Sequence, residues 1–298
     1  SILSQLCHFT SFALRRPKIQ LEKAMFIVSV DVDVGSRALG LANKGKNDAN
    51  VHDHFSEVLI GEIEERALPL FLDFFQDLEI PATFAVRGQL TTVGTDVFEL
   101  LRGSSLKHDI GTHGYYHRDF SGLSETEADI ELSMVSVGMR EIGITPRSFI
   151  FPKNQVAHLC LLEKYGYRCF RGKGGLVNDG MYIERIGQLF DVHPSFYLGQ
   201  SVSPVFLKRI VDVSVKNMVP FHVWFHPWNF GETKESTERA LDRVFFPLFG
   251  YAKEKQREGL LTFETMLSAT SKVENRLSKH SEIESSNSRI TIIGCHSS

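Results

Sequence analysis

The feature that most constrains the fold is a repeated alternation of short apolar runs with amphipathic stretches between residues 25 and 267. Runs such as residues 26–30 and 82–86 are typical of buried strands, and helical patterns follow them. Repeated strand-then-helix units predict a mostly parallel sheet covered by helices, either open or closed into a barrel. In both architectures, functional residues lie at the carboxyl ends of the strands.

The composition excludes several classes of protein. The chain has 298 residues, 42% of them hydrophobic, and its 23 Phe predict a large aromatic core. The net charge of −3 offers no general field for nucleic acid. The four cysteines form no CxxC pair, which is typical of reduced intracellular proteins. Because we find neither a secretion signal in residues 1–24 nor an apolar run that spans a bilayer, we expect a cytoplasmic protein without stable membrane insertion.

The patterning divides the chain into three parts. Residues 25–267 are predicted to form one catalytic domain, and residues 1–24 an extension before it. Residues 268–298 are rich in serine and lack aromatic residues, which predicts a loose tail. The apolar run at residues 290–293 is the part of that tail that could dock on the domain.

Two aspartates, Asp31 and Asp33, follow the first strand-like run. Alternation along a strand points both side chains to the same side. Two carboxylates on one face repel each other unless a cation or a proton separates them. The pattern therefore indicates either a functional pair or a solvated strand end with two surface acids.

Two histidines, His113 and His117, are four residues apart, so one helical turn would bring both imidazoles to one face. Such a pair also arises by chance in a chain with 12 His. Two histidines and one carboxylate form a three-ligand zinc site that leaves a position open for water. The same set occurs in non-haem iron oxygenases, but those sites usually lie on all-β scaffolds, and this chain alternates β and α.

Two further polar clusters follow predicted strands. Pro152, Lys153 and Asn154 stand where a strand meets a helix start that Asn154 is expected to cap. Free backbone N–H groups there can stabilise an oxyanion, although an ordinary turn has the same pattern. His226 ends an aromatic-rich strand; it is either a packed histidine or, beside a metal site, a candidate acid–base residue.

The order of these clusters resembles the polysaccharide deacetylase superfamily, also called NodB homology or carbohydrate esterase family 4, over residues 25–267. The segment from His108 to His117 begins His-Asp-Ile-Gly-Thr-His and resembles that family's His-Glu-Ile-Gly-Asn-His…His metal segment. The Asp-Val-Asp run at residues 31–33 resembles the acidic first motif. The Phe-His-Pro-Trp run at residues 225–228 resembles the last motif.

The resemblance implies an α/β fold, a distorted (β/α) barrel of the glycoside hydrolase/deacetylase type, with one divalent metal ion, expected to be zinc. It implies that Asp33, His113 and His117 bind the metal. Asp31 would then be the catalytic base and His226 the general acid. The expected substrate contacts are Pro152, Lys153, Asn154, Tyr116 and Trp228; Trp228, Tyr116 and its neighbour Tyr115 could equally belong to the core.

The chain departs from the family pattern at two places. The third motif carries an arginine two residues before its proline, and this arginine holds the base; here the position is Ile150. Arg87, Lys153 or Arg171 could replace it. The family also supplies an aspartate that supports the acid histidine, and Asp191 is the best match in this chain.

We therefore predict a hydrolase that acts on carbon–nitrogen bonds other than peptide bonds. Its substrate would be an N-acetylated amino sugar in a polysaccharide, in peptidoglycan or in a sugar precursor, deacetylated by a water bound at the metal. The alternatives are a hydrolase of a linear or cyclic non-sugar amide and a catalytically silent, metal-binding carbohydrate module.

Overall fold

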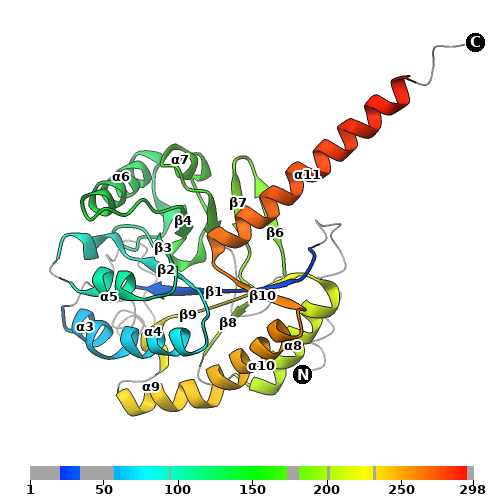
Figure 1. Ribbon diagram of the computed structural model, residues 1–298. Coiled ribbons are helices and arrows are strands. Elements are labelled where there is room, and N and C mark those ends of the chain that lie inside the picture. The colour runs from blue at the N-terminus through cyan, green and yellow to red at the C-terminus, as the bar shows by residue number, and fades with distance from the viewer. Residues whose placement is uncertain are drawn as a thin grey trace, which may run out of the picture.

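The computed structural model describes residues 21–33, 57–93, 95–172, 181–199, 202–230 and 233–293, and it leaves out the side chains of residues 57–59, 228–229 and 280–293. Ten strands form one sheet (Figure 1). Their bounds are β1 Ala24–Val32, β2 Thr83–Val86, β3 Asp109–Thr112, β4 Ser148–Ile150, β5 Cys169–Arg171, β6 Ile183–Ile186, β7 Leu189–Val192, β8 Phe196–Tyr197, β9 Pro220–Phe225 and β10 Leu261–Glu264.

The sheet is parallel throughout except for the antiparallel pair β6 and β7. Its order is β6-β7-β5-β4-β3-β2-β1-β9-β8, and β10 pairs with β1. The long strand β1 pairs with β9 on one edge, while β10 and β2 share the other edge. The sheet curls into a partial barrel, which confirms the predicted distorted (β/α) barrel.

The two faces of β1 belong to different cores. Phe26 and Val28 lie in the large cluster between the sheet and the outer helices, whereas Met25 and Ile27 belong to a smaller cluster inside the barrel. Because side chains alternate along a strand, Asp31 shares the inner face with Met25 and Ile27. The inner face of β1 therefore changes from apolar at its start to acidic at its carboxyl end.

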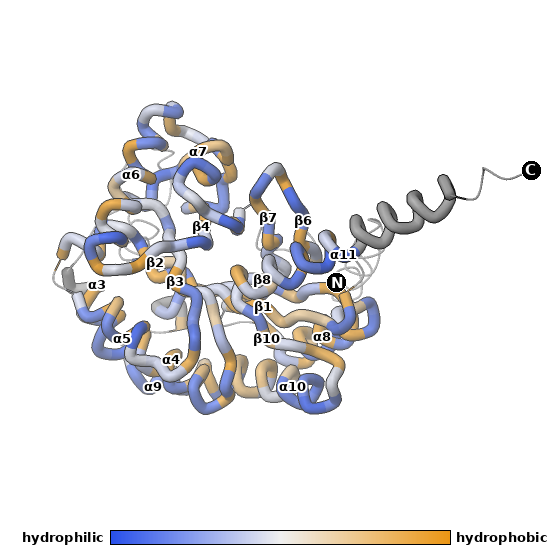
Figure 2. The backbone as a smooth tube through the Cα atoms, turned by 45° about the horizontal axis from the view of Figure 1, so that its top comes forward, coloured by the Kyte–Doolittle hydropathy of each residue, from blue (hydrophilic) through white to orange (hydrophobic). Residues whose placement is uncertain are grey.

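Helices cover the outside of the sheet (Figure 1). In Figure 2, hydrophilic and hydrophobic colours alternate along them, as expected for helices with one face on the core. In the described part of the chain, no helix combines the length and the apolar character that a membrane crossing requires. Their bounds are α3 Glu57–Glu62, α4 Leu68–Asp77, α5 Val97–Gly103, α6 Glu125–Glu141, α7 Leu159–Lys164, α8 Pro204–Asn217, α9 Lys234–Ala240, α10 Phe246–Arg257 and α11 Met266–Ile293.

Two long helical stretches are each interrupted by a π turn. The turn Ile63–Ala67 joins α3 to α4 just before Pro69, and the turn Leu241–Phe245 joins α9 to α10 just before Pro247. Proline lacks the N–H group for a helical bond, and its ring collides with the carbonyl of the preceding turn. A wider turn relieves both problems.

Helix α11 occupies the segment for which the serine-rich composition predicts a loose tail. Met266, Ala269 and Val273 are buried in the inner cluster with Met25 and Ile27, and Leu277 packs beside them. The first turns of α11 are therefore part of the fold. Beyond them, α11 extends away from the sheet (Figure 1).

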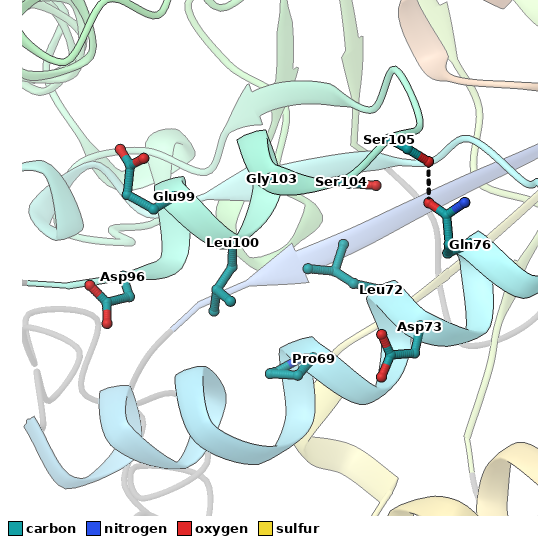
Figure 3. A pocket seen from close by; sticks show the side chains of 10 residues that line it. All are labelled: Pro69, Leu72, Asp73, Gln76, Asp96, Glu99, Leu100, Gly103, Ser104 and Ser105. Carbon is teal, nitrogen blue, oxygen red and sulfur yellow. Dashed lines mark hydrogen bonds between the residues drawn. The ribbon is translucent and has the colours of Figure 1, made fainter.

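A groove of about 810 Å³ lies in the outer helical layer, between α4 and α5 (Figure 3). Leu72 and Leu100 form the apolar part of the groove, and Asp73 and Glu99 make its outer edge acidic. Its lining residues include none of the residues predicted for the functional site. The site is instead built at the carboxyl ends of the strands.

Candidate metal centre

The predicted functional residues meet at the rim, which we define as the carboxyl ends of β1, β3, β4, β5 and β9 with the loops that follow them. Asp31 lies in β1 and Asp33 directly after it, and they are 2% and 1% exposed. Both carboxylates are therefore removed from solvent. This burial excludes the interpretation of two solvated surface acids, because a buried carboxylate needs a partner.

Three side chains on the rim form a candidate metal centre. Asp33, His113 and His117 each bring one donor atom within 4.8 Å of the others, and all three are buried. The Nε2 atom of His117 lies 3.0 Å from Nε2 of His113 and 3.4 Å from Oδ2 of Asp33. Two imidazole nitrogens and a carboxylate oxygen are the donor set of a catalytic zinc site.

The protonation of the two histidines fits a divalent cation. Burial lowers the pKa of both His113 and His117, although the nearby carboxylates raise it. Nδ1 of His113 lies 2.9 Å from the carbonyl oxygen of Ile150. A neutral ring that donates from Nδ1 to this oxygen leaves the Nε2 lone pair directed at the other ligands.

The loop that carries the histidines is not the helical turn that their spacing predicts. Residues 113–119 have no regular structure, and Gly114 and His117 adopt left-handed backbone angles with φ of 68° and 58°. A Cβ atom on Gly114 would also lie only 3.2 Å from Pro152. The prediction that the two imidazoles meet is confirmed, but a tight loop rather than a helix brings them together.

Glu131 of α6 fixes the backbone of this loop through hydrogen bonds. Its Oε2 atom accepts hydrogen bonds from the backbone N–H groups of Tyr115 at 2.9 Å and Tyr116 at 3.0 Å. The side chain is 1% exposed, and burial raises its pKa although both hydrogen bonds oppose that shift. Sequence reasoning missed Glu131, because α6 is amphipathic and one more acid on it carries no signal.

The first half of the motif segment has a structural role. His108 lies before β3, at the opposite end of the strand from the rim, and its Nδ1 accepts a hydrogen bond from the N–H group of Ala82. Burial lowers the pKa of His108 to about 4. Asp109 accepts hydrogen bonds from Thr83 and Ser148 on the two neighbouring strands. These two residues therefore tie strands together away from the metal centre.

Asp31 is paired with a buried arginine. Nη2 of Arg171 donates to Oδ2 of Asp31 at 2.5 Å, and the arginine is fully buried. Burial by itself raises the pKa of Asp31, but the charge of Arg171 and the neighbouring histidines outweigh it, so the pKa lies below its usual value of 3.8. Asp31 is therefore ionised at neutral pH.

His226 lies across the rim from the metal centre. Its Nε2 atom is 3.7 Å from Oδ2 of Asp31 and 3.8 Å from Oδ2 of Asp33. Its ring also contacts the rings of Trp224 and Tyr197, with centroids 5.6 and 6.0 Å away. Tyr197 was not predicted; burial, together with the two aspartates, raises its pKa to about 12, which places a neutral phenol beside them.

The predicted substrate contacts have different positions. Pro152 is buried against the loop that carries His113 and His117. Lys153 and Asn154 form a 3₁₀ turn with left-handed φ of 56° each, in place of the predicted helix start. Tyr116 packs partly against the large core, while the side chain of Trp228 lies outside the described residues. All five assignments remain predictions.

The predicted support of His226 by Asp191 also stays a prediction. The Oδ2 atom of Asp191 lies 3.8 Å from Nδ1 of His193, and both side chains are buried.

Comparisons with known proteins first define the class by its fold. A putative polysaccharide deacetylase from Mycobacterium smegmatis has a TM-score of 0.61 at 16% identity, covering 88% of this chain and 93% of that one. The PuuE allantoinase gives 0.62 at 12% identity, over 89% and 95% of the two chains. A probable polysaccharide deacetylase from Pseudomonas aeruginosa PAO1 gives 0.62 at 13%, over 89% and 96%. At these identities, the likeness establishes a deacetylase-type (β/α) barrel.

A sequence match to a family model covers part of the chain. Residues 61–170 match the family model described as polysaccharide deacetylase, while no curated protein matches the chain. Together with the fold, this match confirms the resemblance that the motifs indicate, to the NodB-homology or carbohydrate esterase 4 superfamily. Members of this family are hydrolases that act on carbon–nitrogen bonds.

Proposed function

We propose that the protein is a metal-dependent hydrolase that removes the N-acetyl group from an N-acetylated amino sugar. The observation that carries the proposal is the composition of the rim. A buried carboxylate that is kept ionised, Asp31, lies beside a three-ligand metal set and faces His226. A base, a metal and an acid within one small site are the groups that amide hydrolysis requires.

Asp33, His113 and His117 would hold the divalent cation, which we propose to be zinc because two imidazoles and one carboxylate suit that ion. Such an ion supplies two effects: it polarises the acyl carbonyl group, and it lowers the pKa of a water molecule. The role of the protein is to hold the three ligands with their donor atoms inward. The hydrogen bond between His113 and the carbonyl oxygen of Ile150 serves this role.

Asp31 would accept the proton of the attacking water. Its low pKa keeps it ionised and able to take this proton at neutral pH. The backbone N–H group of Lys153 would donate to the developing oxyanion, since Lys153 follows β4 at the rim. His226 would donate a proton to the nitrogen of the departing amine, which is otherwise a poor leaving group.

A non-sugar amide is the second candidate substrate. The chain has the same fold as the PuuE allantoinase, with a TM-score of 0.62. The proposed groups would serve a cyclic amide equally, because the scissile bond is again between carbon and nitrogen. An activity assay distinguishes the two substrates. We also propose a cytoplasmic location, which favours a sugar precursor over a wall polymer as the substrate.

The test is a panel assay of the metal-loaded protein. Acetate release is measured from N-acetylated mono- and oligosaccharides, and ring opening from allantoin. His113→Ala should lose both bound metal and turnover, while the matched control His158→Ala, which changes a histidine that is not one of the three proposed metal ligands, should keep both. Metal-loaded protein that binds sugars but releases no acetate would refute the proposal in favour of a silent module. Ring opening without acetate release would favour the second candidate.

A further inference from the structure

We propose that Arg171 is the positioning residue of Asp31, supplied by β5 in place of the arginine that the third motif of the superfamily carries on β4. This inference rests on the proposed function, because it concerns the proposed base. It is carried by the strand register and by a chain of buried hydrogen bonds.

The register of β4 and β5 explains how the arginine can change strand. Ile150 and Arg171 are direct partners across the two parallel strands. Partners in a parallel pair point to the same face, and Ile150 and Cys169 both belong to the inner cluster of the barrel. Arg171 therefore enters the barrel on the same face and at the same height as a side chain at position 150. Moving the arginine by one strand keeps its guanidinium within reach of β1.

Arg171 contacts two successive inward positions of β1. Its Nη2 atom donates to Oδ2 of Asp31 at 2.5 Å, and its Nη1 atom donates to Oγ of Ser29 at 2.8 Å. A planar guanidinium can make both bonds at once, whereas a lysine ammonium acts as a point charge. The fork therefore fixes the orientation of the Asp31 carboxylate as well as its charge.

A second layer of side chains holds Arg171 in place. Oγ of Ser29 lies 2.8 Å from Nε2 of His222, and Nδ1 of His222 lies 3.1 Å from the carbonyl oxygen of Val192. Burial lowers the pKa of His222 to about 3, so the ring is neutral. A neutral ring that donates from Nδ1 to Val192 accepts the Ser29 hydroxyl proton at Nε2. The Ser29 oxygen then keeps its lone pairs for Arg171.

The aromatic ring of Trp224 covers the guanidinium, 4.3 Å from its central carbon. Trp224 is the register partner of Ser29 on β9, so the ring and the hydroxyl reach Arg171 from neighbouring strands. A cation against an indole face is stabilised and shielded from water. The described residues therefore surround Arg171 from β1 and β9 while it points at Asp31.

The other two sequence candidates are placed elsewhere. Arg87 is buried, and its charge interacts with Asp33 and Glu131. Lys153 acts electrostatically on His117. Of the three candidates, Arg171 is the one for which the described structure gives a hydrogen bond to Asp31.

The first part of the test moves the arginine back. Arg171→Met should lower kcat on the order of 10²-fold with little change in KM, because a misplaced base costs about that much. Arg171→Lys should recover only part of the loss. The double variant Ile150→Arg/Arg171→Ile should recover at least about tenfold over Arg171→Met, since the register places both positions on one face. If the folded double variant recovers nothing, Arg171 has only a structural role and the proposal is overturned.

The second part needs no turnover, so it decides the proposal even if the proposed function fails. Without Arg171, the Asp31 carboxylate loses its hydrogen-bonded arginine but keeps its place beside the proposed ligands, where Oδ2 lies 3.9 Å from Nε2 of His113 in the wild type. The Co²⁺ affinity of Arg171→Met, measured by competition with a chelator, should therefore rise about tenfold, because the site becomes more negative by one charge. An unchanged or lower affinity in folded protein would overturn the proposal.

The matched control is Arg168→Met, which removes an arginine of the same segment that pairs with Glu274 instead. Its kcat and its Co²⁺ affinity should equal those of the wild type. A rise in Co²⁺ affinity in the control equal to that in Arg171→Met would assign the effect to net charge and overturn the proposal. Wild-type protein that hydrolyses no substrate would refute the proposed function alone.

Discussion

The buried histidine behind Arg171 makes the fold sensitive to acid. His222 is fully buried, and burial, with a smaller contribution from Arg171, lowers its pKa from 6.5 to about 3. In the folded state the His222 imidazole is therefore neutral, whereas in the unfolded chain the same imidazole takes up a proton near pH 6.5. The stability that His222 contributes is complete above pH 6.5 and is lost as the pH falls from 6.5 towards 3.

The size of this loss follows from the two pKa values. Below pH 6.5, each fall of one pH unit removes about 1.36 kcal/mol from the free energy of unfolding. Between pH 7 and pH 5, His222 alone should lower the free energy of unfolding by ~2 kcal/mol. His222→Gln removes the titration and leaves an amide that can still donate to Val192 or accept from Ser29. Its free energy of unfolding should therefore fall by ~2 kcal/mol less than that of the wild type over this range.

The assay is urea unfolding at several pH values with chelator present, so that metal release does not contribute. His222→Gln is expected to be less stable than the wild type at pH 7, because one amide replaces the two well-placed hydrogen bonds of the imidazole ring poorly. The prediction concerns only how the difference changes with pH. Parallel curves for the two proteins from pH 7 to pH 5 would refute the burial of a neutral His222.

Three further predictions concern the rim and α11. Glu131→Ala should weaken metal binding at least about tenfold, because charge-assisted bonds to the metal loop are worth ~1.5–3 kcal/mol each; an unchanged dissociation constant would contradict this. His226→Ala should keep its metal but lose on the order of 10²–10⁴-fold in amide hydrolysis, and much less on an activated ester, with equal losses counting against an acid role. Removing residues 279–298 should leave the thermal midpoint unchanged, whereas removing residues 268–298 should lower it clearly, because the first turns of α11 are buried; equal midpoints would contradict the packing of α11.

The sequence predicts the site where short-range periodicity decides the geometry. Asp31 and Asp33 share a face because a strand alternates, and His226 reaches the same rim because its strand ends beside β1. The meeting of His113 and His117 was also predicted, but not the conformation that causes it. That loop depends on Glu131, which comes from a helix after it and which no local pattern connects to the histidines.

Two further features, the role of Arg171 and the packing of α11, depend on contacts between segments far apart in the sequence. The role of Arg171 depends on the register between β4 and β5, and a strand of three residues such as β5 carries no periodicity from which register could be read. The packing of α11, by contrast, had a signal. Met266, Ala269 and Val273 have helical spacing, but the serine-rich composition around them points to a loose tail.

The two π turns bear on how this chain could change during evolution. A π turn holds one residue more than the α turn that it replaces, so each is a place where helix length can change by one residue. A deletion within Ile63–Ala67 alone would restore an α turn, yet it would leave Pro69 with a carbonyl against its ring. Loss of the extra residue is therefore tolerated only together with replacement of the proline. In relatives of this protein, helix length and proline at this position should change together.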